Sequence, residues 1–269
     1  MEARSIATQG AEVAEQGGRP AQPRRRRRAR AFLIALGAAG CLGVLVLLAG
    51  VALLTSLPGV SDAQDRTQAI LESNRAVSVG VPPPTRLAAS IVAVEDQRFY
   101  AHHGIDLPSV ARVAWAGVTR SGWQAQGGST ITQQLAKRLY TGDQGGWTLK
   151  LRQIGLAVKL EQRYTKSQIL EMYLDSVYFG SGHWGAVQAS QGYFHKPPRD
   201  LSWGEASLLA GLVQAPSLYD PHVHLTGAEQ RQHHVLDRLV ATGLLSRQQA
   251  LDAARSLELE AGELGFGTE

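Results

Sequence analysis

A charge-free apolar run near the N-terminus constrains this chain more than any other feature of its sequence. Residues 31–54, AFLIALGAAGCLGVLVLLAGVALL, contain 24 positions without a charged side chain. As a helix, such a run is about 36 Å long, which is enough to cross the hydrocarbon core of a bilayer. The apolar region of a cleaved signal peptide is shorter, about 7–15 residues. The sequence therefore predicts a transmembrane helix over 31–54.

The Arg-rich segment before this run predicts how the helix is oriented. RRRRRAR precedes it directly, and the positive-inside rule places such a flank in the cytoplasm. Residues 1–30 hold eight Arg and three Glu, a net charge of +5, and the remaining chain has a net charge of −1. A nearly neutral body does not fit a basic nucleic-acid binder, so binding of nucleic acid by the Arg run is the less favoured interpretation. We predict a cytoplasmic tail over 1–30 and a folded part on the far side of the membrane.

The segment that follows the apolar run has the composition of a connection. Residues 55–84 are rich in Ser, Pro and Gly, and three consecutive prolines occupy positions 82–84. Three prolines in a row do not fit inside a helix, and they stiffen an extended chain. We therefore predict a linker over 55–84. The single cysteine, Cys41, excludes an intramolecular disulfide framework and offers no zinc cluster.

From Thr85 onward, apolar residues recur with helical spacing, and the helix starts carry capping signals. A Ser or Thr followed three residues later by Glu or Gln satisfies the free N–H groups of a first helical turn. Such pairs are Thr130/Gln133, Thr165/Gln168, Ser202/Glu205, Thr226/Glu229 and Ser246/Gln249. No stretch alternates as an extended sheet does. We predict a mainly α domain with loops at 122–128, 141–146, 179–185 and 195–200.

The segment VEDQRFYAHHGID, residues 94–106, concentrates acidic, aromatic and imidazole side chains. Glu95 continues the apolar stripe of Leu87 and Ile91 at a spacing of four, which predicts a partly buried carboxylate suited to accepting a proton. A buried ion pair of Glu95 with Arg98 or a distant Lys is the structural alternative. Asp96 is turned about 100° away on a helix, so we expect it to face Arg98 or water.

A second segment, GGSTITQQLAKRLY at 127–140, places three polar side chains on one helix face. Thr130, Gln134 and Lys137 follow one another at spacings of four and three. The glycines ahead of them allow the backbone to come close to an anion at the helix N-terminus. This face is suited to a sugar and a phosphate, and an ordinary solvated face is the alternative.

The motifs together resemble those of a known family. VEDQRFYAHHGID, GGSTITQQLAKR, KLEQRYTKSQILEMYLDSVYFG, GYFHK and LSWGEASLLAGLVQAPSLYDP follow one another in the order seen in the family 51 peptidoglycan glycosyltransferases. The resemblance covers roughly residues 85–225. It implies a mainly α domain over 85–225 that is lysozyme-like and two-lobed. A C-terminal helical extension over 226–269, with helices separated at Gly243, follows this domain.

The resemblance also implies an activity and a location. These enzymes polymerise lipid II into glycan strands and release undecaprenyl pyrophosphate at the outer face of the bacterial cytoplasmic membrane. Lipid II, the nascent strand and the membrane are the implied partners, and other cell-wall synthesis or division proteins are a further expectation. The leaving pyrophosphate calls for cations or a divalent metal, Mg²⁺ or Mn²⁺, although the sequence indicates no metal site of the protein itself.

Single positions inherit expected roles from the resemblance. Glu95 matches the general base. Side chains that match residues supporting the first motif or contacting substrate are Asp96, Phe99, His102, Thr130, Gln134 and Lys137. Tyr173 matches a residue of the fourth motif, for which we expect a packing role.

The third motif departs from the family pattern. Its usual Arg, Lys and second Glu correspond here to Leu149, Lys150 and Gln153, and an amide cannot give a proton or ligate a metal as a carboxylate does. Arg138 and Asp175 stand where the family usually has Asn. We expect Gln153 at the second catalytic position, with the charge on the substrate met by Lys150, Arg152 and Arg138. Glu161 lies about 12 Å further along the same helix and is too distant to replace Gln153.

Three functional interpretations follow. The favoured one is a glycosyltransferase, with activity weakened by Gln153. The second is a non-catalytic paralogue that binds lipid II or glycan and recruits an active synthase. A lysozyme-like hydrolase is the third, and the GGSTITQQLAK segment argues against it. None of the five Lys residues lies three positions after a Ser, so we expect no penicillin-binding acylation site.

Overall fold

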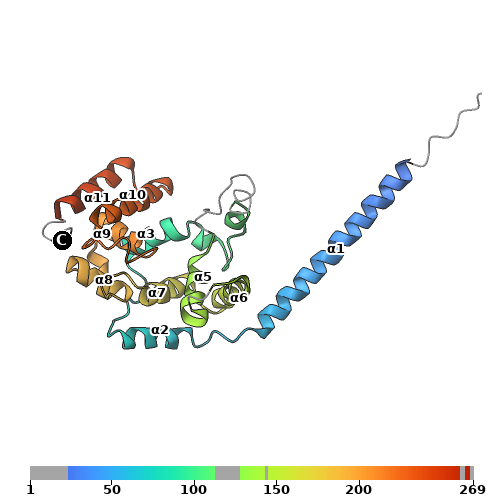
Figure 1. Ribbon diagram of the computed structural model, residues 1–269, viewed down its shortest axis with the longest axis horizontal. Coiled ribbons are helices and arrows are strands. Elements are labelled where there is room, and N and C mark those ends of the chain that lie inside the picture. Colours follow the sequence, from blue (N-terminus) through green and yellow to red (C-terminus); the bar gives the residue numbers. More distant parts are fainter. Residues whose placement is uncertain (1–23, 113–127, 143–144, 261–263, 267–269) are drawn as a thin grey trace, which may run out of the picture. The chain divides into compact units, whose positions relative to one another are not determined.

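The computed structural model describes residues 24–112, 128–142, 145–260 and 264–266, and these are mainly helical (Figure 1). The chain forms two compact units, residues 1–52 and 53–269. Helix α1 (Arg24–Ser56) contains a stretch, Phe32–Ser56, that is long and apolar enough to cross a membrane. The mainly α class and the N-terminal apolar helix are thus confirmed. Most of the predicted loop at 122–128, and positions 143 and 144 of the next loop, lie outside the described residues.

The second unit is an assembly of short helices. Its described residues contain no strand, only an isolated bridge between Tyr178 and Trp184. The elements, in chain order, are α2 (Ala63–Ser73), α3 (Thr85–Glu95), the 3-10 helix η1 (Phe99–Ala101), α5 (Ile131–Ala136), the π-helical turn η2 (Lys137–Thr141), α6 (Trp147–Arg163), α7 (Lys166–Ser176), α8 (Gly185–Phe194), the 3-10 helix η3 (Pro198–Asp200), α9 (Trp203–Leu212), α10 (Leu225–Ala241) and α11 (Arg247–Glu260).

Side-chain caps set the first residue of several helices, as the sequence predicts. The pairs that cap are Thr130/Gln133 at α5, Thr165/Gln168 at α7, Ser202/Glu205 at α9 and Ser246/Gln249 at α11. The prediction for Thr226 and Glu229 is wrong. Helix α10 begins at Leu225, so the N-cap position falls on His224 instead of Thr226, and no side chain caps the helix.

The predicted linker over 55–84 is only partly a spacer. Helix α2 lies within it and buries Ala63, Thr67 and Leu71 against the rest of the unit. The Tyr140 hydroxyl donates to Asp62 at 2.8 Å, and the Arg66 guanidinium donates to the Leu139 carbonyl at 3.1 Å. The sequence interpretation failed because the prolines mark only the end of this segment, whereas the apolar face of α2 makes the segment part of the domain.

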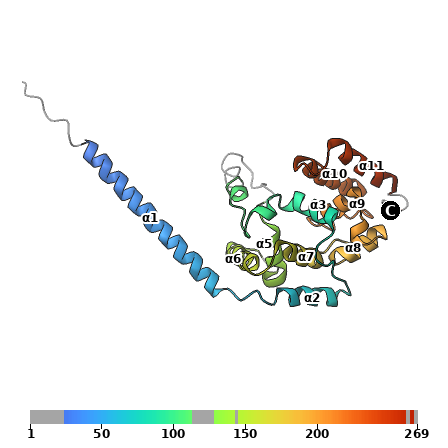
Figure 2. The ribbon, with the colours of Figure 1, turned by 180° about the vertical axis from the view of Figure 1, so that it is seen from behind.

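The helices of the second unit pack as two groups (Figures 1 and 2). In one group, α3 packs against α9 and α10, and α11 packs against α9 and α10. In the other, α5 packs against α6 and α7, and α2 packs against α7. The predicted helices around Gly243 are therefore α10 and α11, but α10 is an integral part of the first group rather than an extension. Residues from α3, α5 and α10 meet in one cavity.

Candidate active site

Glu95 is the last residue of α3 and lies at the edge of the buried stripe that the sequence predicts. Leu87 and Ile91 are fully buried, and the Glu95 side chain retains 14% exposure. Its Oε2 accepts a hydrogen bond from Gln134 Nε2 at 2.6 Å, and its Oε1 lies 3.8 Å from the Arg231 guanidinium. A partly exposed carboxylate held by one amide and one cation can accept a proton from a ligand in the cavity.

The ion pairs of this region differ from the expected ones. Arg98 pairs with Asp106 at 3.2 Å rather than with Glu95 or Asp96. Burial by itself raises the pKa of the Asp106 carboxyl, but hydrogen bonds from Ser109 and the charge of Arg98 outweigh burial and hold that pKa below its usual value. The cation that Glu95 meets comes instead from α10, far along the chain.

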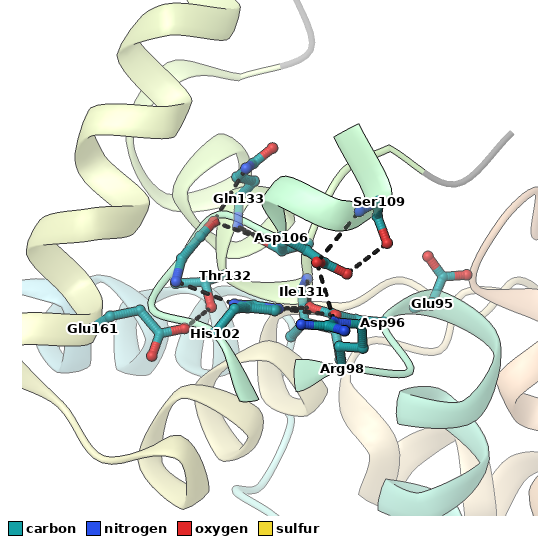
Figure 3. A network of polar contacts seen from close by, with 12 residues as sticks. Glu95, Asp96, Arg98, His102, Asp106, Ser109, Ile131, Thr132, Gln133 and Glu161 are labelled. Atoms are coloured by element: carbon teal, nitrogen blue, oxygen red, sulfur yellow. Dashed lines mark hydrogen bonds and ion pairs between the residues drawn. The ribbon is translucent and has the colours of Figure 1, made fainter. Parts of the chain in front are cut away.

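Asp96 is buried and belongs to an internal network, contrary to the expectation that it faces Arg98 or water (Figure 3). It accepts from His102 Nε2 at 2.9 Å and from the Ile131 N–H at the start of α5 at 3.1 Å. His102 Nδ1 accepts from the Gly104 N–H, so the ring proton sits on Nε2 and points to Asp96. This network ties the segment after α3 to α5, and Glu95 lies apart from it in Figure 3.

Phe99 and Glu161 support the same region from inside. Phe99 is fully buried, with the Lys166 Nζ 4.3 Å from its ring centroid. Glu161 accepts from Thr132 at 2.5 Å and pairs with Lys166 at 2.7 Å. Both residues are committed to internal contacts, and neither lines the cavity beside Glu95.

Thr130 and Gly104 lock the glycine-rich approach to α5. The Thr130 hydroxyl donates to the Gly104 carbonyl at 2.9 Å, and Gln133 donates to the same oxygen at 3.1 Å. Gly104 has a φ of +88°, and a Cβ there would lie 2.9 Å from the Ala157 carbonyl carbon. Only glycine lets this turn approach α6 so closely. Because the Thr130 side chain is engaged by Gly104 and caps α5, it acts mainly as a structural cap at the cavity wall.

The cavity beside Glu95 has a volume of about 550 Å³. Four predicted site residues line it: Glu95, Asp96, Thr130 and Gln134. Its wall is rich in basic side chains. Those basic side chains are Arg98, Arg112, Arg231, His234 and Arg238.

Three of these basic residues come from one face of α10, and sequence reasoning missed all three. Arg231, His234 and Arg238 follow one another at spacings of three and four, so they share a helix face. Burial lowers the pKa of Arg231, and the charge of Glu95 acts against this. Burial, with the charges of Arg231 and Arg238, also lowers the pKa of His234. The spacing of basic residues in RQHHVLDR was the available signal.

The basic residues predicted around the third motif do not line this cavity. Lys150 donates to Ser129 Oγ at 2.6 Å and to Gln133 Oε1 at 2.9 Å. Burial, and then the charge of Lys137, lower the pKa of Lys150. Since Ser129 is itself part of the cavity wall, Lys150 lies one residue behind the wall. Lys137 is half-buried in η2.

Gln153 and Glu95, the predicted catalytic pair, are not brought together in one cavity. Gln153 is buried on α6 and donates to Thr141 Oγ1 at 3.2 Å. Arg152, next to it, is exposed. The prediction that these residues meet the substrate beside Glu95 finds no support in this geometry.

Tyr173 contacts Gln134, the residue that holds Glu95, and Arg138 lies beside Tyr173. Tyr173 is fully buried, and its hydroxyl donates to Gln134 Oε1 at 2.9 Å. The Arg138 guanidinium lies 5.8 Å from the centroid of the Tyr173 ring. Tyr173 therefore does more than pack.

The cavity does not fit a resident divalent metal. Two of its carboxylates are already engaged, Asp96 by His102 and Asp106 by Arg98 and Ser109. Within the described ranges no group of three or more His, Cys, Asp or Glu could hold a metal ion. Glu95 alone offers too few oxygen ligands for Mg²⁺ or Mn²⁺. The groups that the cavity itself offers for chemistry are therefore its side chains.

Comparison with known proteins shows which family the folded unit resembles and over which residues. A family model described as Transglycosylase matches residues 65–240. The chain is 39% identical over 170 residues to penicillin-binding protein 1F of Bacillus subtilis (strain 168), and the alignment covers 63% of this chain and 24% of that protein. It is 42% identical over 176 residues to penicillin-binding protein 1A of Neisseria gonorrhoeae, and this alignment covers 65% of this chain and 22% of that protein.

A crystal structure of penicillin-binding protein 1A from Haemophilus influenzae aligns with 66% of this chain and 17% of its own, at 21% identity and a TM-score of 0.39. The chain spans about a quarter or less of the length of these curated relatives. The family match begins within α2 and ends within α10, so the predicted domain limits of 85 and 225 are too narrow at both ends. The chain belongs to the transglycosylase family, the family 51 glycosyltransferase domain related to class A penicillin-binding proteins.

Proposed function

We propose that this protein polymerises lipid II into glycan strands and releases undecaprenyl pyrophosphate. The observation that carries the proposal is the Glu95 carboxylate, which faces a cavity of about 550 Å³ and is held by Gln134 and Arg231. The family match over residues 65–240 supports the reaction class.

Glu95 supplies the proton acceptor that the reaction needs. A sugar hydroxyl is a poor nucleophile until a positioned carboxylate accepts its proton. In the proposed step the C4 oxygen of the incoming sugar forms a bond with C1 of the growing strand. The bond from C1 to the pyrophosphate oxygen breaks, the proton passes to Glu95, and the electron pair leaves with undecaprenyl pyrophosphate.

The basic face of α10 supplies cations for the phosphate groups of the substrates. Arg231 Nε is buried and has no hydrogen-bond partner within the part of the chain that the structure describes. Such a donor beside Glu95 is suited to an anionic oxygen. These observations support a proposal in which Arg231 and Arg238, rather than Lys150 and Arg152, carry the phosphate contacts at Glu95.

The apolar helix fits the lipid substrate. We propose that α1 crosses the cytoplasmic membrane once, with the Arg-rich tail in the cytoplasm and the folded unit on the outer side. The stretch Phe32–Ser56 has a mean hydropathy of 2.6 and supports this arrangement. A membrane-anchored enzyme meets a substrate that stays in the bilayer.

The test is polymerisation of labelled lipid II by the purified full-length protein in detergent, with and without Mg²⁺ or Mn²⁺. Glu95→Gln is the loss-of-function variant, and Gln153→Glu restores the carboxylate expected from the family. Polymer that disappears in Glu95→Gln supports the proposal.

Three other outcomes replace the proposal with an alternative. Polymer from Gln153→Glu but none from the parent identifies a degenerate enzyme. If neither protein makes polymer and both still bind lipid II, the chain is a glycan- or lipid II-binding paralogue. Release of short products from preformed glycan indicates a hydrolase.

A further inference from the structure

Glu95 stands at the end of a chain of hydrogen bonds that begins at Tyr173. The Tyr173 hydroxyl donates to Gln134 Oε1 at 2.9 Å, and Gln134 Nε2 donates to Glu95 Oε2 at 2.6 Å. The chain joins α7, α5 and α3, so it connects the two groups of helices at the cavity.

The chemistry of its ends gives this chain a single direction. An ionised carboxylate has only acceptors, so Gln134 must present its NH₂ group to Glu95. The carbonyl oxygen of Gln134 then faces Tyr173, whose hydroxyl donates its proton to that oxygen. If the amide were turned over, two oxygens would face each other at Glu95.

Burial keeps the start of the chain in the required protonation state. Tyr173 is fully buried. Burial, and then the negative charge of Glu95, raise the pKa of the Tyr173 hydroxyl far above its usual value, and Arg138 acts against both. The hydroxyl therefore stays a neutral O–H donor throughout the range in which proteins are stable.

We propose that Tyr173 fixes the amide of Gln134 so that its NH₂ group always faces Glu95, which makes Tyr173 a positioning residue for the general base. This inference rests on the proposed function of Glu95. Its consequence is that an amide that cannot turn away always offers a donor to the proton-accepting carboxylate of Glu95.

The test compares Tyr173→Phe with a matched control, Tyr193→Phe. Tyr193 is also buried, and its hydroxyl donates to the Phe179 carbonyl at 3.2 Å, away from Glu95. Both substitutions remove one buried hydroxyl that donates to a carbonyl oxygen. The readouts are the pH–rate profile of lipid II polymerisation and hydrogen exchange of the Gln134 side-chain NH₂ group in protein labelled with ¹⁵N-glutamine.

We expect the acidic limb of the Tyr173→Phe profile to move to higher pH, because a hydrogen bond to the ionised carboxylate favours that form. We expect KM to change less than about twofold and the Gln134 NH₂ group to exchange at least about tenfold faster, since a tenfold change corresponds to the loss of one modest hydrogen bond. Tyr193→Phe should leave the profile and the exchange rate unchanged. The Gln134 signal is the one that Gln134→Leu removes.

Gln134→Leu also provides the second route to the answer. It removes the donor itself, and in the double variant with Tyr173→Phe the shift of the acidic limb should equal that of Gln134→Leu alone, because both act through one contact. Additive shifts overturn the proposal. Unchanged Gln134 exchange in folded Tyr173→Phe also overturns it, and this readout needs no turnover. Absence of polymer from the parent protein contradicts the proposed function instead.

Discussion

Two helices of the domain carry basic side chains that could meet a phosphate, and only one of them, α10, contributes such side chains to the cavity beside Glu95. On α10, Arg231 and Arg238 line the cavity, and Arg231 approaches Glu95 at 3.8 Å. On α6, Lys150 is used to hold Ser129 and Gln133, and Arg152 is exposed. The difference teaches that a basic motif identifies a family but does not by itself place a charge. What a cation can do depends on which acceptors the fold leaves beside it.

The largest expected effect comes from Glu95 itself. Glu95→Gln should lower the rate of lipid II polymerisation by at least about 100-fold, because the amide cannot accept the proton of the attacking hydroxyl. The measurement is initial polymerisation rate at saturating lipid II. Glu72→Gln, an exposed glutamate on α2, is the matched control and should retain the parent rate. A Glu95→Gln rate close to that of the parent would mean that the reaction does not take place in the cavity beside Glu95.

The basic residues of α10 and α6 can be compared directly by one pair of substitutions. Arg231→Gln should lower kcat/KM for lipid II about tenfold, or about 1.4 kcal/mol, because it removes a cation next to Glu95 and to the substrate phosphates. Arg152→Gln should change kcat/KM less than about twofold, as expected for an exposed residue. Steady-state kinetics of both variants decide the comparison, and the reverse order would place the phosphates at α6.

Gln153→Glu tests whether α6, like α10, contributes to the reaction. Gln153 is buried and donates to Thr141, and a carboxylate there can only accept. We expect the polymerisation rate to change less than about threefold and the free energy of unfolding to fall by about 1–3 kcal/mol at pH 7. Thermal unfolding and initial rates measure the two effects. A rate increase of more than about tenfold means that α6 closes onto the substrate.

The sequence predicted the parts of the site that are local. Glu95 follows Leu87 and Ile91 on one helical stripe, and the caps at Thr165 and Ser202 are set by residues three positions away. Such features depend on spacing along one element, which a sequence displays. The same reasoning failed for Asp96, whose partner His102 becomes close only through a turn of the chain.

The contacts from α10 could not be predicted in this way. Arg231 reaches Glu95 because α10 packs against α3, and that packing depends on the whole arrangement of helices. Likewise, the segment that leads into α2 is held by hydrogen bonds from Tyr140 and Tyr164, which are distant in sequence. The spacing of Arg231, His234 and Arg238 indicates a shared face, but only the fold shows which cavity that face lines.

The smallest predicted effect concerns a buried carboxylate that has neutral donors in place of a cation. Asp175 accepts from Ser78 Oγ at 2.6 Å and from the Val79 N–H at 2.8 Å, and burial raises its pKa above the usual 3.8 in spite of these hydrogen bonds. A group whose pKa is raised by folding stabilises the fold below its unfolded pKa, and this contribution is lost as the pH rises through the folded pKa.

Asp175→Asn keeps an oxygen for Val79 and removes the charge. We expect its Tm to exceed that of the parent by about 2–4 °C at pH 7, or about 1 kcal/mol, and to equal it near about pH 3.5. Exposed Asp200→Asn should show neither effect in the same thermal scans. A lower Tm for Asp175→Asn at pH 7 would mean that the carboxylate gains more from Ser78 and Val79 than burial costs it.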